Sequence, residues 1–490
     1  MKLNYKKTIL VGFAFFLISA FWQAYDAIVP LILTNHFGLL QSVSGAIMSL
    51  DNVIAVFMLP LFGAISDKIC SRYGKRTPFV FVGTILAIVL FIALAFVDSA
   101  QVSNISGLGL DEMYENAEAL RDEAYALKDA GNVAEGEARL AQADAAFEEI
   151  RLATYAITSN NMGCLIGFIA TLLFLLIAMA TFRSPAVALM PDVTVKPLRS
   201  KGNAIINLMG TGGGIIALAL GIVFATSKEL FNSYIGYVMA VAGVMAIGLI
   251  IFLATVKEKK WAREMEEDSE RYGLKEVAAA GGEKRKLSRA EVRSLLLILA
   301  SVALWYIGYN SITSKYSVYA TNELGFDYGS TLIIAQAAAI VSYIPVGIIA
   351  SKIGRKKSIL VGVVILASAF FLGNFITPNS PELIMYPIFV LAGIGWATIN
   401  VNSFPMVVEL ASGGDVGRYT GFYYTASMAA QIVAPILSGV LYDWFTMRAM
   451  FFAFGTVFVA ASFVTMFFVK HGDSTPEASG VLESLGNDND

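Results

Sequence analysis

The chain has 490 residues, of which 57% are hydrophobic and 15% are charged, and its formal net charge is −3 at pH 7. This composition lies outside the range of soluble globular proteins and indicates a protein that crosses a membrane several times. The net charge gives no reason to expect a nucleic-acid partner. With two cysteines and two histidines in the whole chain, we expect no disulfide, no metal site and no cofactor.

A bilayer core about 30 Å thick requires roughly 20 apolar residues in each spanning helix. Runs of that length, separated by charged or glycine- and proline-rich stretches, predict about twelve transmembrane helices. On one side of the membrane the loops and ends hold about 27 of the 35 basic residues, so the positive-inside rule places both termini in the cytoplasm. We expect a multi-pass protein of the plasma (inner) membrane. The predicted spans are 8–34, 43–66, 78–97, 161–190, 202–225, 233–255, 293–321, 329–350, 358–377, 383–409, 419–441 and 449–469.

Two hydrophilic segments interrupt these spans. Residues 99–160 are rich in Ala, Glu and Leu, with a break at Gly131 and Asn132, and predict an external helical hairpin whose small and apolar residues recur at helical spacing. We interpret this hairpin as structural decoration, with a lid or a partner-binding module as the alternative. Residues 256–292 mix basic and acidic side chains and predict a cytoplasmic linker.

The parts of the chain on either side of the linker resemble each other. Pro60 and Pro345 are each followed by a glycine and a basic cluster, and the spacing Arg199-x-x-Gly202 recurs as Arg418-x-x-Gly421. Two repeats of six helices are typical of transporters whose halves rock about a substrate site near the middle of the membrane. The predicted divisions are helices 1–3 in 1–98, the insertion 99–160, helices 4–6 in 161–255, the linker 256–292, helices 7–12 in 293–470 and a disordered cytoplasmic tail 471–490.

The loop after the second span, Gly63-x-x-x-Asp67 followed by Arg72-x-Gly74-Lys75-Arg76, resembles the signature between helices 2 and 3 of the major facilitator superfamily. Its longer form, Ser-Asp-x4-Arg-x-Gly-Lys-Arg-x-Pro, is similar to that of sucrose-proton symporters and of the glycoside-pentoside-hexuronide cation symporter branch. The resemblance covers nearly the whole chain outside 99–160. It implies an all-α membrane protein with 12 transmembrane helices in two pseudo-symmetric six-helix halves, here with the hairpin inserted between helices 3 and 4.

Charged residues at the cytoplasmic helix ends are expected to form a gate. Asp67 can pair with the basic residues that follow it, in a lock that breaks as the halves move, although the positive-inside rule alone also accounts for several of these cations. Arg183 is expected near this level, paired with Asp192 or Glu409. The predicted gate, with two glycines that fit a close helix approach and a tight turn, comprises Gly63, Asp67, Arg72, Gly74, Arg76, Arg183, Asp192, Arg199, Arg355, Glu409 and Arg418.

Asp26 interrupts an apolar run, where an ionised carboxylate is costly. Counting residues from the outer helix ends places Asp51 and Lys315 at a similar depth, so we expect the three to form a proton-coupling site. In this hypothesis Asp26 takes a proton while the outer side is open, and Lys315 approaches and favours release once that side closes. In the alternative, Tyr25 or Asn52 holds Asp26 as a packing residue, Asp51 is solvated and Lys315 extends to the outer surface.

The chain departs from the families that it resembles at two places. Sodium-coupled sugar symporters carry acids one and two turns from the helix-2 proline, where this sequence has Ala55 and Leu59. Plant-type sucrose symporters carry an acid and an arginine at a particular register of helix 4, whereas LLIAMATFRSPAVALMPD has no acid before Asp192. These departures favour proton coupling through helix 1 over sodium coupling.

Polar and aromatic residues on the cavity-facing helices predict the substrate class. Amides match sugar hydroxyls and aromatic faces cover C–H patches, whereas lipids or apolar drugs require Leu, Met and Phe. We expect about half of the candidate contacts to touch the substrate. They are Trp22, Gln23, Tyr25, Asn52, Asn207, Tyr309, Asn310, Gln336, Trp396, Asn400, Asn402 and Gln431.

The sequence thus predicts a monomeric secondary transporter that imports a sugar, a disaccharide such as sucrose or maltose, by proton symport with alternating access. Its expected partners are the sugar, the coupling proton and the lipid bilayer. The alternatives are a sodium-coupled sugar symporter, an efflux or lysolipid transporter of the same fold, and a non-transporting membrane sensor that uses the hairpin. An enzyme is not expected, because the sequence offers no nucleophile–base set, metal cluster or phosphate loop.

Overall fold

The computed structural model describes residues 3–69, 71–195, 198–272, 288–410 and 416–471. Across these residues the regular structure is helical, apart from an isolated β-bridge between Ser71 and Gly74. Eleven of the described helices are long and apolar enough to cross a membrane, and a shorter apolar stretch, Tyr328–Tyr343, adds to them. The all-α, multi-pass class is therefore confirmed. Cys70, residues 273–287 of the linker and the tail beyond His471 lie outside the described residues.

Six spans form the first half of the bundle. The first ends in a π-helical segment, and the second is interrupted at Ser49, which places Asp51 in the first turn of its longer part. The elements are α1 (Tyr5–Leu31) with η1 (Ile32–His36), α2 (Gln41–Met48) with α3 (Leu50–Lys68), α4 (Thr77–Ile105), α7 (Met162–Val193), α8 (Arg199–Val223) and α9 (Ile235–Thr255).

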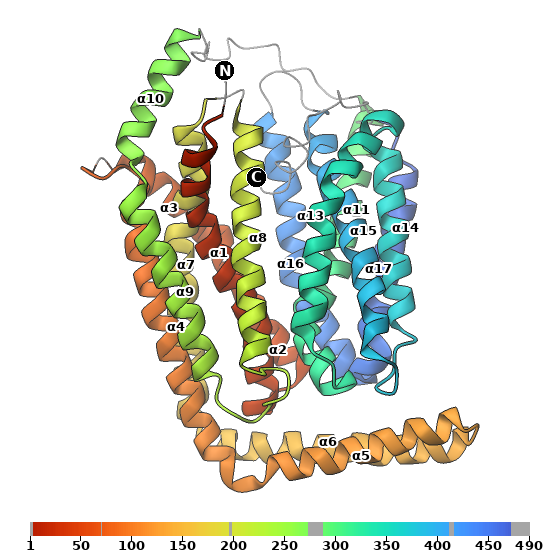
Figure 1. The fold of residues 1–490 in the computed structure, drawn as a ribbon. Helices are drawn as coiled ribbons and strands as arrows, with labels where there is room; N and C mark the ends of the chain where they lie inside the picture. The colour runs from red at the N-terminus through yellow and green to blue at the C-terminus, as the bar shows by residue number, and fades with distance from the viewer. Residues whose placement is uncertain (1–2, 70, 196–197, 273–287, 411–415, 472–490) are drawn as a thin grey trace.

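The second half repeats this packing beside the first (Figure 1). Its elements are α11 (Arg289–Thr313) with α12 (Tyr316–Val318) and η4 (Tyr319–Leu324), α13 (Tyr328–Ile353), α14 (Arg355–Gly373), η5 (Glu382–Ile384) with α15 (Met385–Val408), α16 (Val416–Phe445) and α17 (Met447–Phe467). As α4 packs against α7 and α9, so α14 packs against α15 and α17. The predicted arrangement of two related six-helix halves is confirmed.

The helices approach closely where glycine replaces a side chain. A Cβ atom on Gly213 in α8 would lie 2.4 Å from the carbonyl oxygen of Phe16 in α1. Any larger residue at this position would push the two helices apart. Small residues commonly permit such contacts between membrane helices, where packing rather than the hydrophobic effect holds helices together.

A buried contact between a histidine and an aspartate fixes the end of the first span. His36 Nδ1 lies 2.5 Å from Asp98 Oδ1 in α4, and both side chains are fully buried. The other ring nitrogen, Nε2, lies 3.0 Å from the carbonyl oxygen of Leu230. Because buried polar groups require hydrogen-bond partners, this pair ties η1 to α4.

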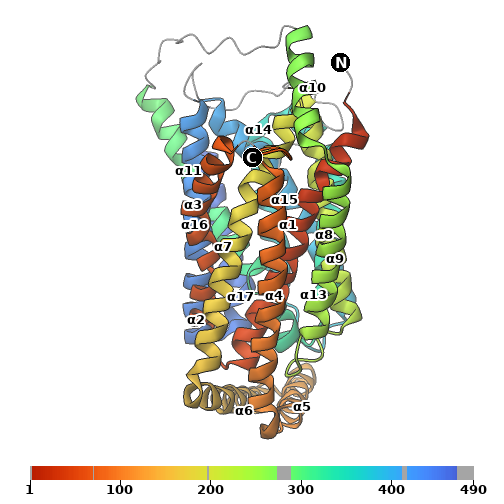
Figure 2. The same ribbon diagram turned by 90° about the vertical axis from the view of Figure 1, so that its left-hand side faces the viewer.

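Two further helices, α5 (Leu110–Asp129) and α6 (Val133–Asn160), pack along each other and cross one end of the bundle (Figures 1 and 2). The chain reaches them from α4 through η2 (Ser106–Leu108). They occupy the segment for which the sequence predicts a hairpin. We call this end of the bundle the hairpin end, and the opposite end, which carries α10 (Glu258–Arg271) and the N-terminus, the α10 end.

Candidate functional site

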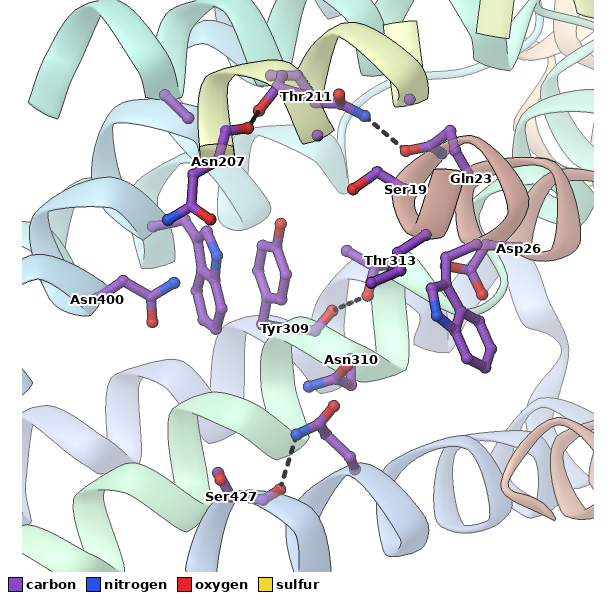
Figure 3. A pocket seen from close by; sticks show the side chains of 18 of the residues that line it. Ser19, Gln23, Asp26, Asn207, Thr211, Tyr309, Asn310, Thr313, Asn400 and Ser427 are labelled. Atoms are coloured by element: carbon purple, nitrogen blue, oxygen red, sulfur yellow. Dashed lines mark hydrogen bonds between the residues drawn. The ribbon is translucent and has the colours of Figure 1, made fainter. Parts of the chain in front are cut away.

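A cavity of about 990 Å³ lies between the two halves, at the upper end of the size range of small-molecule sites. Figure 3 shows that its polar side chains come from several helices and point toward one another. Ten of the twelve predicted substrate contacts line it. They are Trp22, Gln23, Asn52, Asn207, Tyr309, Asn310, Gln336, Trp396, Asn400 and Gln431.

The other two predicted contacts face away from the cavity. Tyr25 is fully buried, and its ring packs on Phe21 with centroids 6.0 Å apart. Asn402 is 2% exposed, and its Nδ2 donates to the carbonyl oxygen of Thr398 at 2.9 Å. Each lies one or two residues from a lining residue, Asp26 or Asn400, and therefore on a different face of its helix.

Some lining residues that were not predicted share a helix face with the predicted substrate contacts. Helix α1 presents positions spaced by three or four residues to the cavity, because such positions share one face of an α-helix. Ser19 belongs to this face but was not predicted, although it lies four residues before Gln23. The other polar lining residues that were not predicted include Ser184, Thr211, Tyr306, Thr313, Ser317 and Ser427.

The cavity combines an aromatic wall with amides from both halves. The rings of Tyr309 and Trp396 are stacked in parallel, with centroids 3.6 Å apart and 5° between planes. Tyr306 meets Trp396 edge-on at 5.3 Å. Gln336 Nε2 in α13 donates to Gln23 Oε1 in α1 at 2.6 Å, so the two halves contact each other across the cavity (Figure 3). Flat apolar rings beside amides suit a ligand that has both C–H faces and hydroxyl groups.

Asp26 lies on the polar face of α1, deep in the bundle, and is exposed to the cavity (Figure 3). Among the described residues, Ser317 donates to its backbone carbonyl oxygen at 3.4 Å. The hydroxyl of Tyr25 has no hydrogen-bond partner in the described part of the chain, and Asn52 Nδ2 donates to Asp51 at 2.6 Å. The packing alternative requires a hydrogen bond from Tyr25 or Asn52 to the Asp26 carboxylate. Neither residue makes that bond in the described part of the chain.

Arg183 lies at the level of these carboxylates and lines the cavity. Its Cζ is 5.4 Å from the centroid of the Trp22 ring, and its guanidinium interacts electrostatically with Asp51. The predicted pairing with Asp192 or Glu409 is wrong. A rise of about 1.5 Å per residue places Arg183 roughly 13 Å along α7 from Asp192, too far for contact. The charged layer beside Asp26 consists of Asp51 and Arg183.

Lys315 is absent from this layer, and the predicted grouping with Asp26 is wrong for this residue. Its ammonium is fully buried and donates to the carbonyl oxygen and the Oε1 of Gln41, at 2.7 and 2.8 Å. The carboxylate of Asp443 interacts with it electrostatically and accepts hydrogen bonds from two backbone amides at the start of α2. Because α11 ends at Thr313, Lys315 follows a helix end and extends toward α2.

Two matching segments meet at the hairpin end. Thr34–Gly38 and Thr321–Gly325 share the pattern Thr-Asn-x-x-Gly, and both glycines have positive φ, 65° and 69°. The side-chain amides of Asn35 and Asn322 bond each other reciprocally, with N···O distances of 3.2 and 2.7 Å. This pair joins η1 of the first half to η4 of the second.

Further hydrogen bonds close the hairpin end. Thr226 Oγ1 lies 2.5 Å from the hydroxyl of Tyr328, and Ser227 Oγ donates to Asp327 Oδ1 at 2.9 Å, each across the two halves. In the other direction the cavity lining extends as far as Pro191, near the end of α7. The structure is therefore closed at the hairpin end, and this is the state in which Lys315 contacts Gln41 and not Asp26.

Comparison with known proteins decides the family. The profile described as Major Facilitator Superfamily matches residues 151–344 and 328–485, and the profile described as MFS/sugar transport protein matches residues 10–108. The chain belongs to the major facilitator superfamily. It is accordingly a membrane transporter and not an enzyme. The narrower resemblance to sucrose-proton symporters stays a prediction.

Other members of the superfamily share its fold at low sequence identity. The MFS-type transporter MJ1317 of Methanocaldococcus jannaschii is 24% identical over 295 residues, which cover 58% of this chain and 68% of that protein. The inward-open conformation of the xylose transporter XylE from E. coli superposes with a TM-score of 0.62 at 13% identity, covering 98% of this chain and 99% of that one. A POT family transporter in complex with 5-aminolevulinic acid gives 0.63 at 12% identity, covering 95% and 96%.

The signature loop of this major facilitator transporter is centred on Arg76. This side chain is buried, and its Nη2 and Nε contact Asp67 Oδ1 at 2.5 Å and Asp192 Oδ2 at 2.7 Å. Its Nη1 donates to Ser66 Oγ. Three predicted gate residues thus form one cluster, which lies within the first half.

Glu258 completes this loop, and nothing in the sequence pattern indicated it. Its buried carboxylate accepts hydrogen bonds from the backbone amides of Lys75, Arg76 and Thr77 at 2.6, 2.9 and 2.7 Å, and from the hydroxyl of Thr77 at 2.7 Å. These amides open α4, whose N-terminus favours a negative charge. Gly74 confirms the predicted tight turn with φ of +127°, and an added Cβ would lie 2.2 Å from the carboxyl carbon of Glu258.

The remaining predicted gate residues each contact a neighbour in their own half. Arg355 forms an ion pair with Glu409 in the second half. The other contacts are Arg72 over the ring of Tyr73 at 4.6 Å, Arg199 Nε to the carbonyl oxygen of Thr194 at 3.2 Å, Arg418 over the ring of Phe422 at 5.4 Å, and Gly63 against Ser184, whose Oγ would lie 2.9 Å from an added Cβ.

Proposed function

We propose that this transporter imports a sugar together with a proton, by exposing the central cavity alternately to the two sides of the membrane. The observation that carries the proposal is the Asp26 carboxylate, which is exposed in a cavity lined by amides, hydroxyls and aromatic rings. A carboxylate can bind and release one proton, as a coupling group must. Intramembrane acids that face a cavity commonly mark proton pathways.

The charges around the cavity support proton coupling at Asp26. Among the described residues that line the cavity, Asp26 is the one acid and Arg183 the one base. Because Arg183 interacts with Asp51, these two charges compensate each other and Asp26 supplies the excess charge. Proton binding to Asp26 makes the group of three neutral. A neutral cavity can be enclosed at lower cost than a charged one, so conformational exchange follows proton binding.

The lining supports a sugar substrate of disaccharide size. Gln23 and Gln336 each offer amide groups that can exchange their mutual hydrogen bond for bonds to hydroxyls. The stacked Tyr309 and Trp396 offer a flat face for the C–H side of a sugar ring. The match of the first spans to a profile of sugar transport proteins, and the similarity to a structure described as a xylose transporter, also support this class.

Sodium coupling is the less favoured alternative. The sodium-coupled sugar symporters that this chain resembles carry acids at the positions of Ala55 and Leu59. Both residues line the cavity, where their side chains provide hydrocarbon instead of the oxygen ligands that a hard cation requires.

The distribution of basic residues supports an orientation with both termini in the cytoplasm. The membrane of this proposal is the plasma membrane. In this orientation the hairpin end faces outward, and the conformation described is closed to the outside. A monomer suffices for the proposed cycle, because the cavity is formed by the two halves of one chain.

Uptake by the purified protein in proteoliposomes tests the proposal. A panel of monosaccharides and disaccharides is offered under an imposed proton gradient and, separately, a sodium gradient. We expect proton-driven accumulation of a disaccharide. Asp26→Asn should abolish accumulation but preserve exchange of labelled for unlabelled sugar, whereas Asp111→Asn, on the exposed start of α5, should change neither.

Three results would contradict the proposal in different ways. Proton-driven accumulation by Asp26→Asn at the wild-type rate would refute coupling at that residue. Accumulation driven by sodium alone would favour the sodium-coupled alternative. Binding or transport of no sugar in the panel would refute the substrate class.

A further inference from the structure

The α5–α6 hairpin is connected to the first half at both ends and extends toward the second half. It follows α4 through η2, and α6 leads into α7. Apolar residues near its base form a small core with Leu230 and Phe231 from the loop between α8 and α9. In Figure 1 the turn between α5 and α6 lies beyond the base, on the side of the second half. The hairpin thus moves with the first half while it spans the joint between the halves.

An arginine of the hairpin contacts the second half. Arg121 in α5 is 2% exposed, and its Nη1 donates to the backbone carbonyl oxygen of Asn322 at 2.5 Å. Its Nη2 bonds Glu118 Oε1 at 2.9 Å, and its Cζ lies 5.1 Å from the centroid of the Phe147 ring. Asn322 is the residue whose side chain pairs with Asn35 across the halves. Arg121 therefore supports the same joint from outside.

An arginine of the second half contacts the hairpin in return. Arg448 in α17, whose side chain is 18% exposed, lies 3.4 Å from Asp144 Oδ1 in α6 through Nη1. Its Nη2 lies 3.1 Å from Glu323 Oε2 in η4, and its Cζ is 5.8 Å from the centroid of the Tyr125 ring in α5. One guanidinium thus contacts both helices of the hairpin and the end of the seventh span.

From these contacts we propose that the hairpin is a latch, which holds the transporter closed at the hairpin end and sets the balance between its two conformations. Alternating access requires the halves to separate at this end. Separation must break the contacts of Arg121 with Asn322 and of Arg448 with Asp144, because the hairpin stays with the first half. Buried guanidinium groups that lose charge-assisted partners are costly, so the hairpin favours the closed state.

Distances between the outer ends of the halves test the latch without any substrate. Spin labels are placed on Ser103→Cys in α4 and Leu383→Cys in η5, both exposed, after Cys70 and Cys164 are replaced by serine. We expect Arg121→Gln and Arg448→Gln each to raise the ratio of open to closed molecules about tenfold, as loss of one buried charged hydrogen bond implies.

Arg139→Gln is the matched control. Arg139 Nη2 pairs with Glu123 at 2.8 Å and its Nη1 with Gln142 at 3.0 Å, so its contacts stay inside the hairpin. The control should leave the distance distribution unchanged. Unchanged distributions in Arg121→Gln and Arg448→Gln would overturn the proposal, and so would an equal shift in Arg139→Gln, which would indicate a general loss of hairpin structure.

A cross-link provides a second test that does not depend on weakened folding. Cysteines at Asp144 and Arg448, joined by a short bifunctional maleimide, should lock the latch and reduce sugar exchange to less than about a tenth. The same reagent at Glu123→Cys and Arg139→Cys should leave exchange unchanged. Full exchange by the cross-linked Asp144–Arg448 pair would overturn the proposal. Because the spin-label readout needs no substrate, failure of the latch is distinguishable from failure of the proposed sugar transport.

Discussion

Removing the Glu258 carboxylate should loosen the start of α4. In Glu258→Ala, three backbone amides and one hydroxyl lose their acceptor, and two of those amides belong to the buried residues Arg76 and Thr77. An unsatisfied buried donor costs about 1–3 kcal/mol and a lost anion at a helix N-terminus about 0.3–1 kcal/mol, so local opening should become easier by roughly 3–5 kcal/mol. This corresponds to amide exchange that is at least about a hundredfold faster.

Hydrogen exchange measured by mass spectrometry on peptides that cover residues 71–82 provides the assay. Glu258→Gln should give an intermediate rate, because its amide keeps one acceptor oxygen but turns a donor group toward the backbone amides. Glu267→Ala changes an exposed carboxylate on the same helix and should leave the exchange rate unchanged. Wild-type exchange in Glu258→Ala would refute the role assigned to this residue.

Gly74 provides an independent check of the same contact. Gly74→Ala places a methyl group on the Glu258 carboxylate and in a backbone conformation that side chains rarely adopt. It should accelerate exchange over residues 71–82 on its own, and by less in the Glu258→Ala background, where the clash is absent and only the backbone strain remains. Fully additive effects of the two substitutions would show that they act through different contacts.

Three further substitutions test the cavity and its closure. Trp396→Ala should raise the KM for the transported sugar about tenfold with a smaller change in kcat, and Trp396→Phe should recover part of the loss, because a stacked aromatic face contributes to binding. Arg183→Gln leaves Asp51 without its cation and should reduce exchange to roughly a tenth, while combination with Asp51→Asn should restore part of it. Lys315→Met should increase opening at the hairpin end in spin-label distances, yet keep proton-driven accumulation that Asp26→Asn abolishes; loss of proton coupling without added opening would contradict this placement.

Hydropathy predicted the spans because each membrane helix must satisfy its backbone internally within an apolar segment of fixed length. It could not predict where a helix continues outside the membrane. The third span was expected to end at 97, but α4 continues to Ile105 and leads into the hairpin. The seventh was expected to be continuous to 321, but α11 ends at Thr313. Lys315 at the break is flanked on both sides by apolar or neutral residues, so composition did not reveal that the helix ends there.

The candidate site was predictable to the extent that polar residues in apolar helices must face one another. The cavity amides and aromatic rings followed from this rule, whereas Tyr25 and Asn402 lie on faces of their helices that do not line the cavity. Depth counting failed for Arg183 and Lys315, whose long side chains reach partners on other helices. Glu258 carries no local signal at all, because the amides that it binds lie more than 180 residues earlier in the chain.

The reciprocal pair of Asn35 and Asn322 joins the halves as identical patches join the subunits of a homodimer. Each asparagine gives one hydrogen bond and receives one, so replacing either removes both bonds. The next residue breaks this equivalence, since His36 binds Asp98 within its own half while Glu323 turns to Arg448. The single inserted hairpin, which is connected to the first half, contacts Arg448 on that second side. The contact between the halves is symmetric at the two asparagines. The contacts of the next residues make it asymmetric.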